Sequence, residues 1–185
     1  MSDDLLEYAL PGNRVLCFAP EVVARFRMHR QHRLWRKEAG GQLFATMTGK
    51  VVDIREATGP RPSDRRSLFG YVPHRAAEQA EIKARYARGL HFIGDWHTHR
   101  QAMPEPSSTD LHSMQDMFKR SDHDTPGFIL VVVGTELFPE GLHVSYHQAG
   151  GWHELKLKEA PVVVEGGANG RGAKMRQSPN GKAST

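Results

Sequence analysis

Cysteine is nearly absent from this sequence, in which Cys17 is the only one among 185 residues. A single cysteine cannot form an internal disulfide, and it cannot build a thiolate-rich zinc site or a zinc finger. The Cys-x-x-Cys pair of the zinc deaminases is missing as well, which excludes that class of site. Any metal held by this chain must therefore be bound by histidine and carboxylate side chains.

Long apolar runs are absent too. No part of the sequence approaches the roughly 20 consecutive apolar residues that a membrane-spanning helix needs. The chain begins Met1-Ser2-Asp3-Asp4, whereas a secretory signal begins with basic residues and continues into an apolar run. We therefore expect a cytoplasmic protein with no membrane partner.

The composition is that of a folded protein, with 38% hydrophobic and 25% charged residues, and the length suits one domain with its own core. The net charge of +4 comes largely from residues 25–37 and 171–185. This distribution favours a solvated helix face and a basic tail over a nucleic-acid groove, and no nucleic-acid-binding motif accompanies it. A nucleic-acid binder stays an alternative that salt-dependent retention on DNA would test.

Residue periodicity predicts an α/β (α+β) single domain, with a mixed β-sheet flanked by about three helices. The apolar run 128–133 favours a central strand buried on both faces. We assign residues 1–12 to a lead-in, 13–164 to the domain, and 165–185 to a basic tail expected to be disordered. The expected strands are 13–19, 42–47, 50–57, 67–72, 91–99, 128–133, 142–147 and 152–157, with a hairpin turn at Thr48-Gly49 and a loop over residues 59–67. The expected helices are 20–35, 74–88 and a third ending near residue 120.

The segment His97-Thr98-His99 lies in the expected strand 91–99. Alternate residues of a strand point to the same face, so both imidazoles can reach one metal ion, while Trp96 and Thr98 face the opposite side. With 11 histidines in the chain, a His-x-His pair is nearly expected by chance. The spacing therefore gains weight only from further ligands.

Asp110 follows His99 by eleven residues and lies at the expected start of the third helix. A carboxylate there faces back toward the end of the preceding strand. The same residues also fit a capping box, in which Ser107 is the N-cap and the acid lies near the positive end of the helix dipole. Both interpretations of Asp110, ligand and cap, remain open at this point.

Glu38 precedes the glycine pair Gly40-Gly41, which we interpret as a sharp turn from helix into strand. A lone glutamate at a helix end is usually a surface residue. The full set changes this: Glu38, then His97-Thr98-His99, seven residues, Ser107, two residues and Asp110.

This set resembles the signature of the JAMM (MPN-plus) zinc metalloproteases, and it is complete. Gly94-Asp95-Trp96 before the histidines and Pro106-Ser107-Ser108-Thr109 around the serine extend the resemblance, which covers roughly residues 14–157. It implies the JAMM/MPN (cytidine-deaminase-like) fold, a twisted sheet flanked by helices. Arg100 departs from the family, in which a proline often follows the second histidine, and this affects the loop over the metal.

Two neutral imidazoles and one carboxylate leave an open fourth position on Zn²⁺, as in catalytic sites. We expect one zinc per chain, held by His97, His99 and Asp110, with Glu38 as the general base. The resemblance implies that the hydroxyl of Ser107 stabilises the oxyanion. Asp95 shares the strand face of the histidines and either orients one of them or is an ordinary acid.

Members of this family commonly cleave the isopeptide or peptide bond after the tail of a ubiquitin-like protein. These motif segments resemble those of the stand-alone bacterial enzymes of antiphage defence operons (CBASS or Bil type). The expected partner is therefore a ubiquitin-like protein or its conjugate with a target. Processing of a sulfur-carrier protein and a non-catalytic scaffold of the same fold are the alternatives; scaffold members usually lack motif residues.

Overall fold

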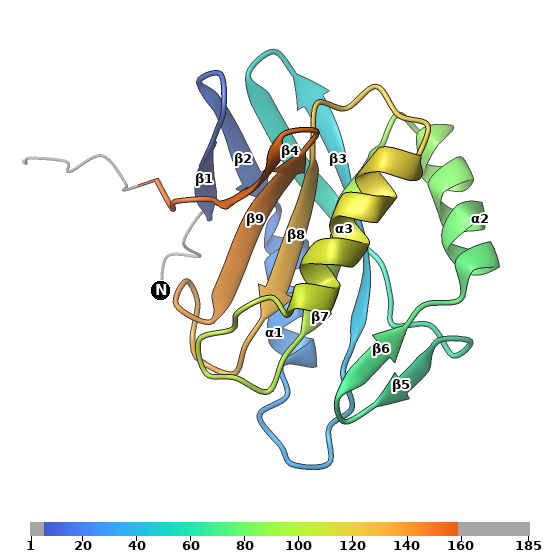
Figure 1. The fold of residues 1–185 in the computed structure, drawn as a ribbon, viewed down its shortest axis with the longest axis vertical. Coiled ribbons are helices and arrows are strands. Elements are labelled where there is room, and N and C mark those ends of the chain that lie inside the picture. The colour runs from blue at the N-terminus through green and yellow to red at the C-terminus, as the bar shows by residue number, and fades with distance from the viewer. Residues whose placement is uncertain (1–5, 159–185) are drawn as a thin grey trace, which may run out of the picture.

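The computed structural model describes residues 6–158, which form a mixed sheet with three helices and a separate hairpin (Figure 1). The strands are β1 (Glu7–Leu10), β2 (Arg14–Phe18), β3 (Gly40–Thr48), β4 (Val51–Ala57), β5 (Arg65–Ser67), β6 (Gly70–Val72), β7 (His91–Thr98), β8 (Phe128–Val133), β9 (Leu142–Gln148) and β10 (Gly151–Glu154). The helices are α1 (Pro20–His29), α2 (Arg75–Tyr86) and α3 (Ser108–Arg120). The predicted fold class is confirmed.

Eight strands form the main sheet in the order β1-β2-β4-β3-β7-β8-β9-β10, and β5 pairs with β6 alone. The sheet is mixed because β2 runs parallel to β4 and β7 runs parallel to β8, whereas the other neighbours are antiparallel. The predicted hairpin around Thr48-Gly49 is confirmed as β3 and β4. Strand β7, which carries His97 and leads directly into His99, therefore lies near the middle of the sheet.

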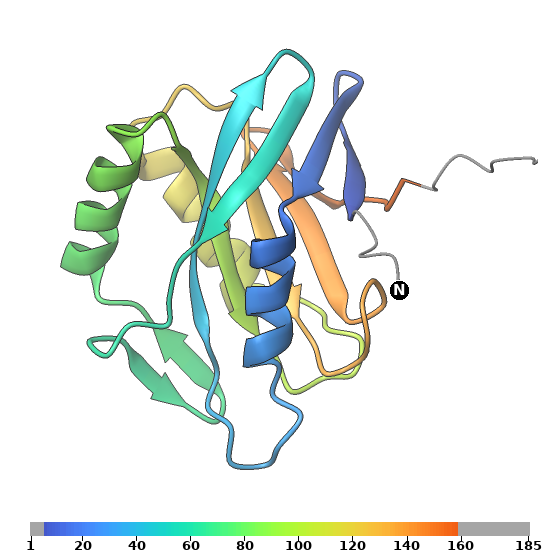
Figure 2. The ribbon, with the colours of Figure 1, turned by 180° about the vertical axis from the view of Figure 1, so that it is seen from behind.

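Helices cover both faces of the sheet, α1 on one side and α2 and α3 on the other; Figure 2 shows α1 from behind. Under α1, the larger core cluster brings Phe26 against Trp96, whose ring centroids are 5.3 Å apart. Under α3, a smaller cluster joins Met114 to Phe128, Leu130 and Val132 of β8. The alternate residues of β8 belong to the first cluster, so this strand is buried on both faces, as its apolar run predicts.

Helix α1 ends at His29 rather than near Trp35, so that prediction was too long. The cause is the buried amide of Gln31, which donates hydrogen bonds to the carbonyl oxygens of Arg36 (3.0 Å) and Leu68 (3.3 Å). These partners draw the chain into a loop against the hairpin β5–β6. Neither glycine nor proline marks this end of the helix, so no local signal predicted it.

Two short strands were not predicted. Strand β1 lies within residues 1–12, assigned to a lead-in, and pairs antiparallel with β2, so the sheet begins before residue 13. Strand β5 lies within the expected loop 59–67, and the expected strand 67–72 is the end of β5, a turn and then β6. Residues 159–185, and with them the expected disordered tail, lie outside the described residues. Within 6–158, none of the helices combines the length and hydrophobicity that a bilayer crossing requires.

Candidate metal centre and active site

Strand β7 positions both imidazoles on one face of the sheet. His97 pairs with Gly40 of β3, and His99 follows the end of β7, where its backbone N–H donates to the carbonyl of Val133 (2.9 Å). Between them, Thr98 points to the opposite face and is fully buried, where its hydroxyl accepts from Ala39 N–H (3.0 Å). The predicted opposite orientation of Trp96 and Thr98 is confirmed, since Trp96 is also fully buried in the core.

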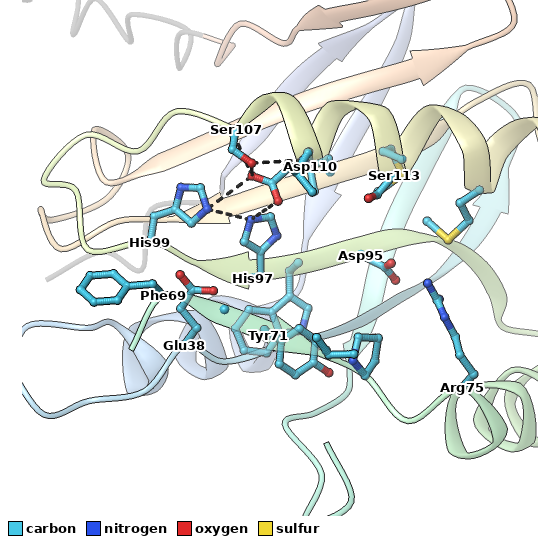
Figure 3. A pocket seen from close by; sticks show the side chains of 18 residues that line it. Glu38, Phe69, Tyr71, Arg75, Asp95, His97, His99, Ser107, Asp110 and Ser113 are labelled. Carbon is cyan, nitrogen blue, oxygen red and sulfur yellow. Dashed lines mark hydrogen bonds and ion pairs between the residues drawn. The ribbon is translucent and has the colours of Figure 1, made fainter. Parts of the chain in front are cut away.

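Asp110 reaches the histidines because a capping box starts helix α3. The Ser107 hydroxyl and the Ser107 N–H both donate to Asp110 Oδ2 at 2.7 Å, and Asp110 N–H donates to Ser107 Oγ at 3.2 Å. The cap thus exists, and it does not compete with a ligand role, because it turns the carboxylate toward both imidazoles (Figure 3). Burial opposes ionisation of Asp110, but His97 and His99 hold its pKa well below the usual range.

The side chains of His97, His99 and Asp110 form a triangle whose ligand atoms all lie within 4.8 Å of one another. His97 Nε2 lies 3.1 Å from His99 Nε2 and 3.4 Å from Asp110 Oδ1, and His99 Nε2 lies 3.4 Å from the other carboxylate oxygen, Oδ2. Tetrahedral zinc, with bonds of about 2.0 to 2.1 Å, requires ligand atoms about 3.3 to 3.4 Å apart. The side chains His97, His99 and Asp110 therefore fit a metal ion, and no other such group occurs within residues 6–158.

The second ring nitrogen of His99 fixes which atom can bind a metal. His99 Nδ1 lies 3.0 Å from the carbonyl oxygen of Glu105, which can only accept, so Nδ1 carries the proton. In the neutral ring, Nε2 then presents its lone pair toward His97 and Asp110. A backbone carbonyl behind a metal-binding imidazole is the usual orienting contact.

Glu38 lies beside this triangle with its carboxylate directed toward the two histidines (Figure 3). Its backbone N–H donates to Ser67 O at 2.8 Å and its carbonyl accepts from the Arg66 guanidinium, so the hairpin β5–β6 fixes it from one side. The next residue pairs with Thr98 of β7, which fixes it from the other. Burial raises the pKa of Glu38, against the opposing charges of His97 and His99.

The glycine pair after Glu38 serves close packing and makes no turn, so our interpretation of it was wrong. Gly40 and Gly41 open β3, and the chain before them is a loop. A Cβ on Gly41 would lie 1.9 Å from the carbonyl oxygen of Thr58, and one on Gly40 would lie 2.6 Å from the ring of Tyr71. Glycine is required here because the hairpin and residue 58 approach the strand so closely.

A cleft of about 570 Å³ opens over the triangle. Its walls come from the hairpin, which contributes Phe69 and Tyr71, and from α3, which contributes Ser113 and Met117. The expected strand 67–72 includes both hairpin residues, but nothing in the sequence marked them as part of the site, because two three-residue strands among charged residues have no clear periodicity.

Arg100, the departure from the family pattern, ties two loops together at the edge of the cleft. Its guanidinium donates to the carbonyl of Leu34 at 2.6 Å and lies 5.3 Å from the ring centroid of Phe69. The loop after α1 and the tip of the hairpin are thus held by one side chain.

Asp95 lies in the same cleft but away from the triangle, between His97 and Arg75 (Figure 3). Its Oδ1 is inaccessible to solvent and has no hydrogen-bond partner within residues 6–158. Burial, and then the charge of Glu78, raises the pKa of Asp95 to about 8. Within residues 6–158 no hydrogen bond joins Asp95 to a histidine, so its expected role in orienting one stays a prediction.

Comparison with known proteins places this arrangement in a family. Residues 20–146 match the model of the prokaryotic homologs of the JAB domain. A Pseudomonas aeruginosa protein named "CD-NTase/cGAS isopeptidase" is 30% identical over 137 residues, covering 72% of this chain and 87% of that protein. A Vibrio cholerae protein of the same name is 26% identical over 141 residues, covering 75% and 88%.

The solution structure of a Desulfitobacterium hafniense protein has the same fold, with a TM-score of 0.54 at 14% identity, over 74% of this chain and 87% of that one. The fold, the donor cluster and these relatives define a peptidase of the JAMM type. The chain belongs to the prokaryotic JAB-domain family.

Proposed function

We propose that this protein is a zinc-dependent isopeptidase or peptidase that cleaves after the C-terminal tail of a ubiquitin-like protein, either in a precursor or in a conjugate with a target. The observation that carries the proposal is the triangle of His97, His99 and Asp110 with Glu38 beside it. The isopeptidase names of the two relatives support a conjugate as substrate, and the CD-NTase in those names supports a cytoplasmic role in antiphage defence.

Zinc suits the donor set better than a harder cation, because two imidazoles and one carboxylate are typical ligands of catalytic zinc sites. When bound, zinc would lower the pKa of a water molecule to about 7 and polarise the scissile carbonyl. The side chains around the triangle must then transfer the proton and stabilise the oxyanion.

Glu38 is the proposed general base and then general acid. Its carboxylate takes the proton of the attacking water as the new C–O bond forms, and it returns that proton to the leaving nitrogen as the C–N bond breaks. The products are a carboxylate on the tail and a free amine on the target. A pKa raised by burial suits this role, because a carboxylate whose pKa is closer to neutrality takes a proton from water more readily.

Ser107 is the proposed donor to the oxyanion. In the structure its hydroxyl proton points to Asp110 Oδ2, so the donor already lies at the rim of the site. Rotation about χ1 or sharing of that proton would bring it to a substrate oxygen. Loss of one such donor costs about 10² to 10³ in rate.

The hairpin β5–β6 offers a place for an extended tail. No strand of the main sheet pairs with this hairpin, and its strand β6 lines the cleft through Gly70, Tyr71 and Val72. An extended peptide can pair with such an edge, which gives affinity without reading its sequence.

The test is cleavage of fusions that carry a ubiquitin-like C-terminus, with zinc and with a chelator. We expect chelator-sensitive cleavage at the end of the tail. Glu38→Ala should keep zinc but lose nearly all turnover, whereas Glu21→Gln, an exposed acid of α1, should match the wild type. Zinc-loaded Glu38→Ala with wild-type activity would refute the assignment.

The alternatives make different predictions in the same assay. A sulfur-carrier processing enzyme would cleave only fusions that carry a sulfur-carrier tail. A scaffold would cleave none of them, although this chain retains the complete set of motif residues.

A further inference from the structure

Asp95 stands out within the cleft because its carboxylate has no partner. Oδ1 is buried, and no hydrogen bond or ion pair satisfies it within residues 6–158. A buried carboxylate without a partner is costly, and proteins retain such groups where a ligand completes them. The side chain lies on the cleft wall between His97 and Arg75, so a ligand in the cleft can reach it (Figure 3).

Arg75 does not supply the missing partner. Its guanidinium pairs with Glu78 at 3.0 Å, and its side chain is 77% exposed. The other cation whose charge acts on Asp95, Arg61, is already engaged by Glu81 and by the oxygens of Gln42 and Thr58. Glu78, which lines the adjoining hollow together with Asp95 and Arg75, therefore adds a second acid near Asp95 and already occupies the arginine.

The spacing of Asp95 from His97 along β7 indicates how far from the scissile bond a substrate side chain that contacts Asp95 must lie. Asp95 and His97 are alternate residues of β7, so they lie about 6.6 Å apart along the strand. An extended peptide has the same repeat, so a side chain that contacts Asp95 belongs about two to three residues from the bond over the triangle.

The cleft continues beyond Asp95, away from the triangle. A second hollow of about 750 Å³ shares Arg75, Asp95 and Met117 with the first, and runs between α2 and α3 toward Tyr86 and His123. An extended chain several residues long has room on this side. In an isopeptide substrate, the target side of the scissile bond is a flexible lysine side chain, which does not need a long groove. The hollow between α2 and α3 therefore suits the tail.

We propose that Asp95 is a specificity-determining residue whose carboxylate accepts a hydrogen bond from an arginine or lysine side chain of the tail, two to three residues before the scissile bond. The proposal rests on the proposed function, because it needs a tail in the cleft. A cation is the favoured donor because it can donate a hydrogen bond to the carboxylate of Asp95 and its charge offsets the two neighbouring acids, Asp95 and Glu78.

The probe is a fusion that the wild-type enzyme cleaves, remade with arginine, lysine, glutamine or methionine at the second, third and fourth positions before the scissile bond. We expect kcat/KM to be at least about tenfold higher for arginine or lysine than for glutamine at one of these positions. Asp95→Asn should remove that preference. Asp116→Asn should preserve it, because Asp116 lies on α3 outside the cleft and pairs with His112.

The ratio between substrates separates this role from a structural one. If Asp95 only oriented His97, Asp95→Asn would lower zinc affinity and slow every substrate equally, with the preference intact, and the proposal would be overturned. Equal rates for all tails in the wild type would also overturn it. In both cases chelator-sensitive cleavage would persist, whereas the absence of any cleavage would count against the proposed function itself.

Discussion

Ser107 connects the start of helix α3 to the metal centre, so substitutions there separate two effects. Ser107→Ala removes the hydroxyl that accepts from Asp110 N–H at 3.2 Å and donates to Asp110 Oδ2 at 2.7 Å. Loss of a serine N-cap costs about 1 kcal/mol, which lowers Tm by about 2 to 4 °C in a chain of this size. Loss of an orienting hydrogen bond to a metal ligand weakens metal binding by about 10- to 100-fold.

Ser107→Gly also removes the hydroxyl, but glycine at an N-cap costs only a few tenths of a kcal/mol. We therefore expect both variants to lose zinc affinity and kcat/KM to a similar extent, while Tm falls clearly only in Ser107→Ala. Ser107→Thr keeps the hydroxyl and should resemble the wild type in all three quantities.

The assays are thermal unfolding of the metal-free protein, zinc titration against a competing chelator, and turnover of a fusion substrate. If Ser107→Ala and Ser107→Gly bind zinc as tightly as the wild type, the capping box does not orient Asp110. If their zinc-saturated kcat/KM is also unchanged, the role of Ser107 at the oxyanion is refuted.

Three further predictions concern packing, metal and pH. Gly41→Ala should destabilise the fold by about 1 to 3 kcal/mol or more in chemical denaturation, because the new Cβ meets Thr58 O, while Gly150→Ala, which meets nothing within 4 Å, should be neutral. Zinc at a thousandfold over its Kd should stabilise the protein by about 4 kcal/mol in the same measurement, and His97→Ala should abolish this effect. Burial lowers the pKa of His147 to about 4 from 6.5, so the unfolded chain binds more protons and stability should fall by about 3 kcal/mol between pH 6.5 and 4. His147→Gln should flatten that pH profile, and an unchanged slope would contradict the burial argument.

The sequence was sufficient for the central part of the fold. Strand β8 could be predicted because six consecutive apolar residues fit only a strand covered on both faces. The pairing of β3 with β4 followed from a local turn at Thr48-Gly49. Where the determining contacts are local or purely apolar, the pattern of residue types carries enough information.

The end of α1 and the pairing of β5 with β6 could not be predicted, although the expected strand 67–72 contains β6, because side chains distant in sequence determine them. Gln31 stops the helical path by bonding to Leu68, which lies on the hairpin. The hairpin in turn is held to the strand start by the bond from Glu38 N–H to Ser67 O. Hydrogen bonds between residues distant in sequence do not produce a periodic pattern of residue types, so the sequence does not reveal them.

The candidate site was anticipated as a set of residues, and the structure brings Glu38, His97, His99, Ser107 and Asp110 together. Spacing could suggest these residues because two of them share a strand face and two share a helix start. The direction of Asp95 could not be predicted, because strand parity fixes the face of a side chain and says nothing of where its carboxylate turns.

The two-sided backbone anchoring of Glu38 has a consequence for control of the enzyme. Because its N–H and carbonyl bond to the hairpin and the following residue bonds to β7, the hairpin cannot tilt without carrying the acid with it. A molecule that binds at Phe69 and displaces the hairpin tip from Arg100 would thus move the carboxylate of Glu38, while the ligand atoms of His97, His99 and Asp110 stayed in place. Inhibition could then begin at an exposed aromatic ring, with the metal ligands untouched.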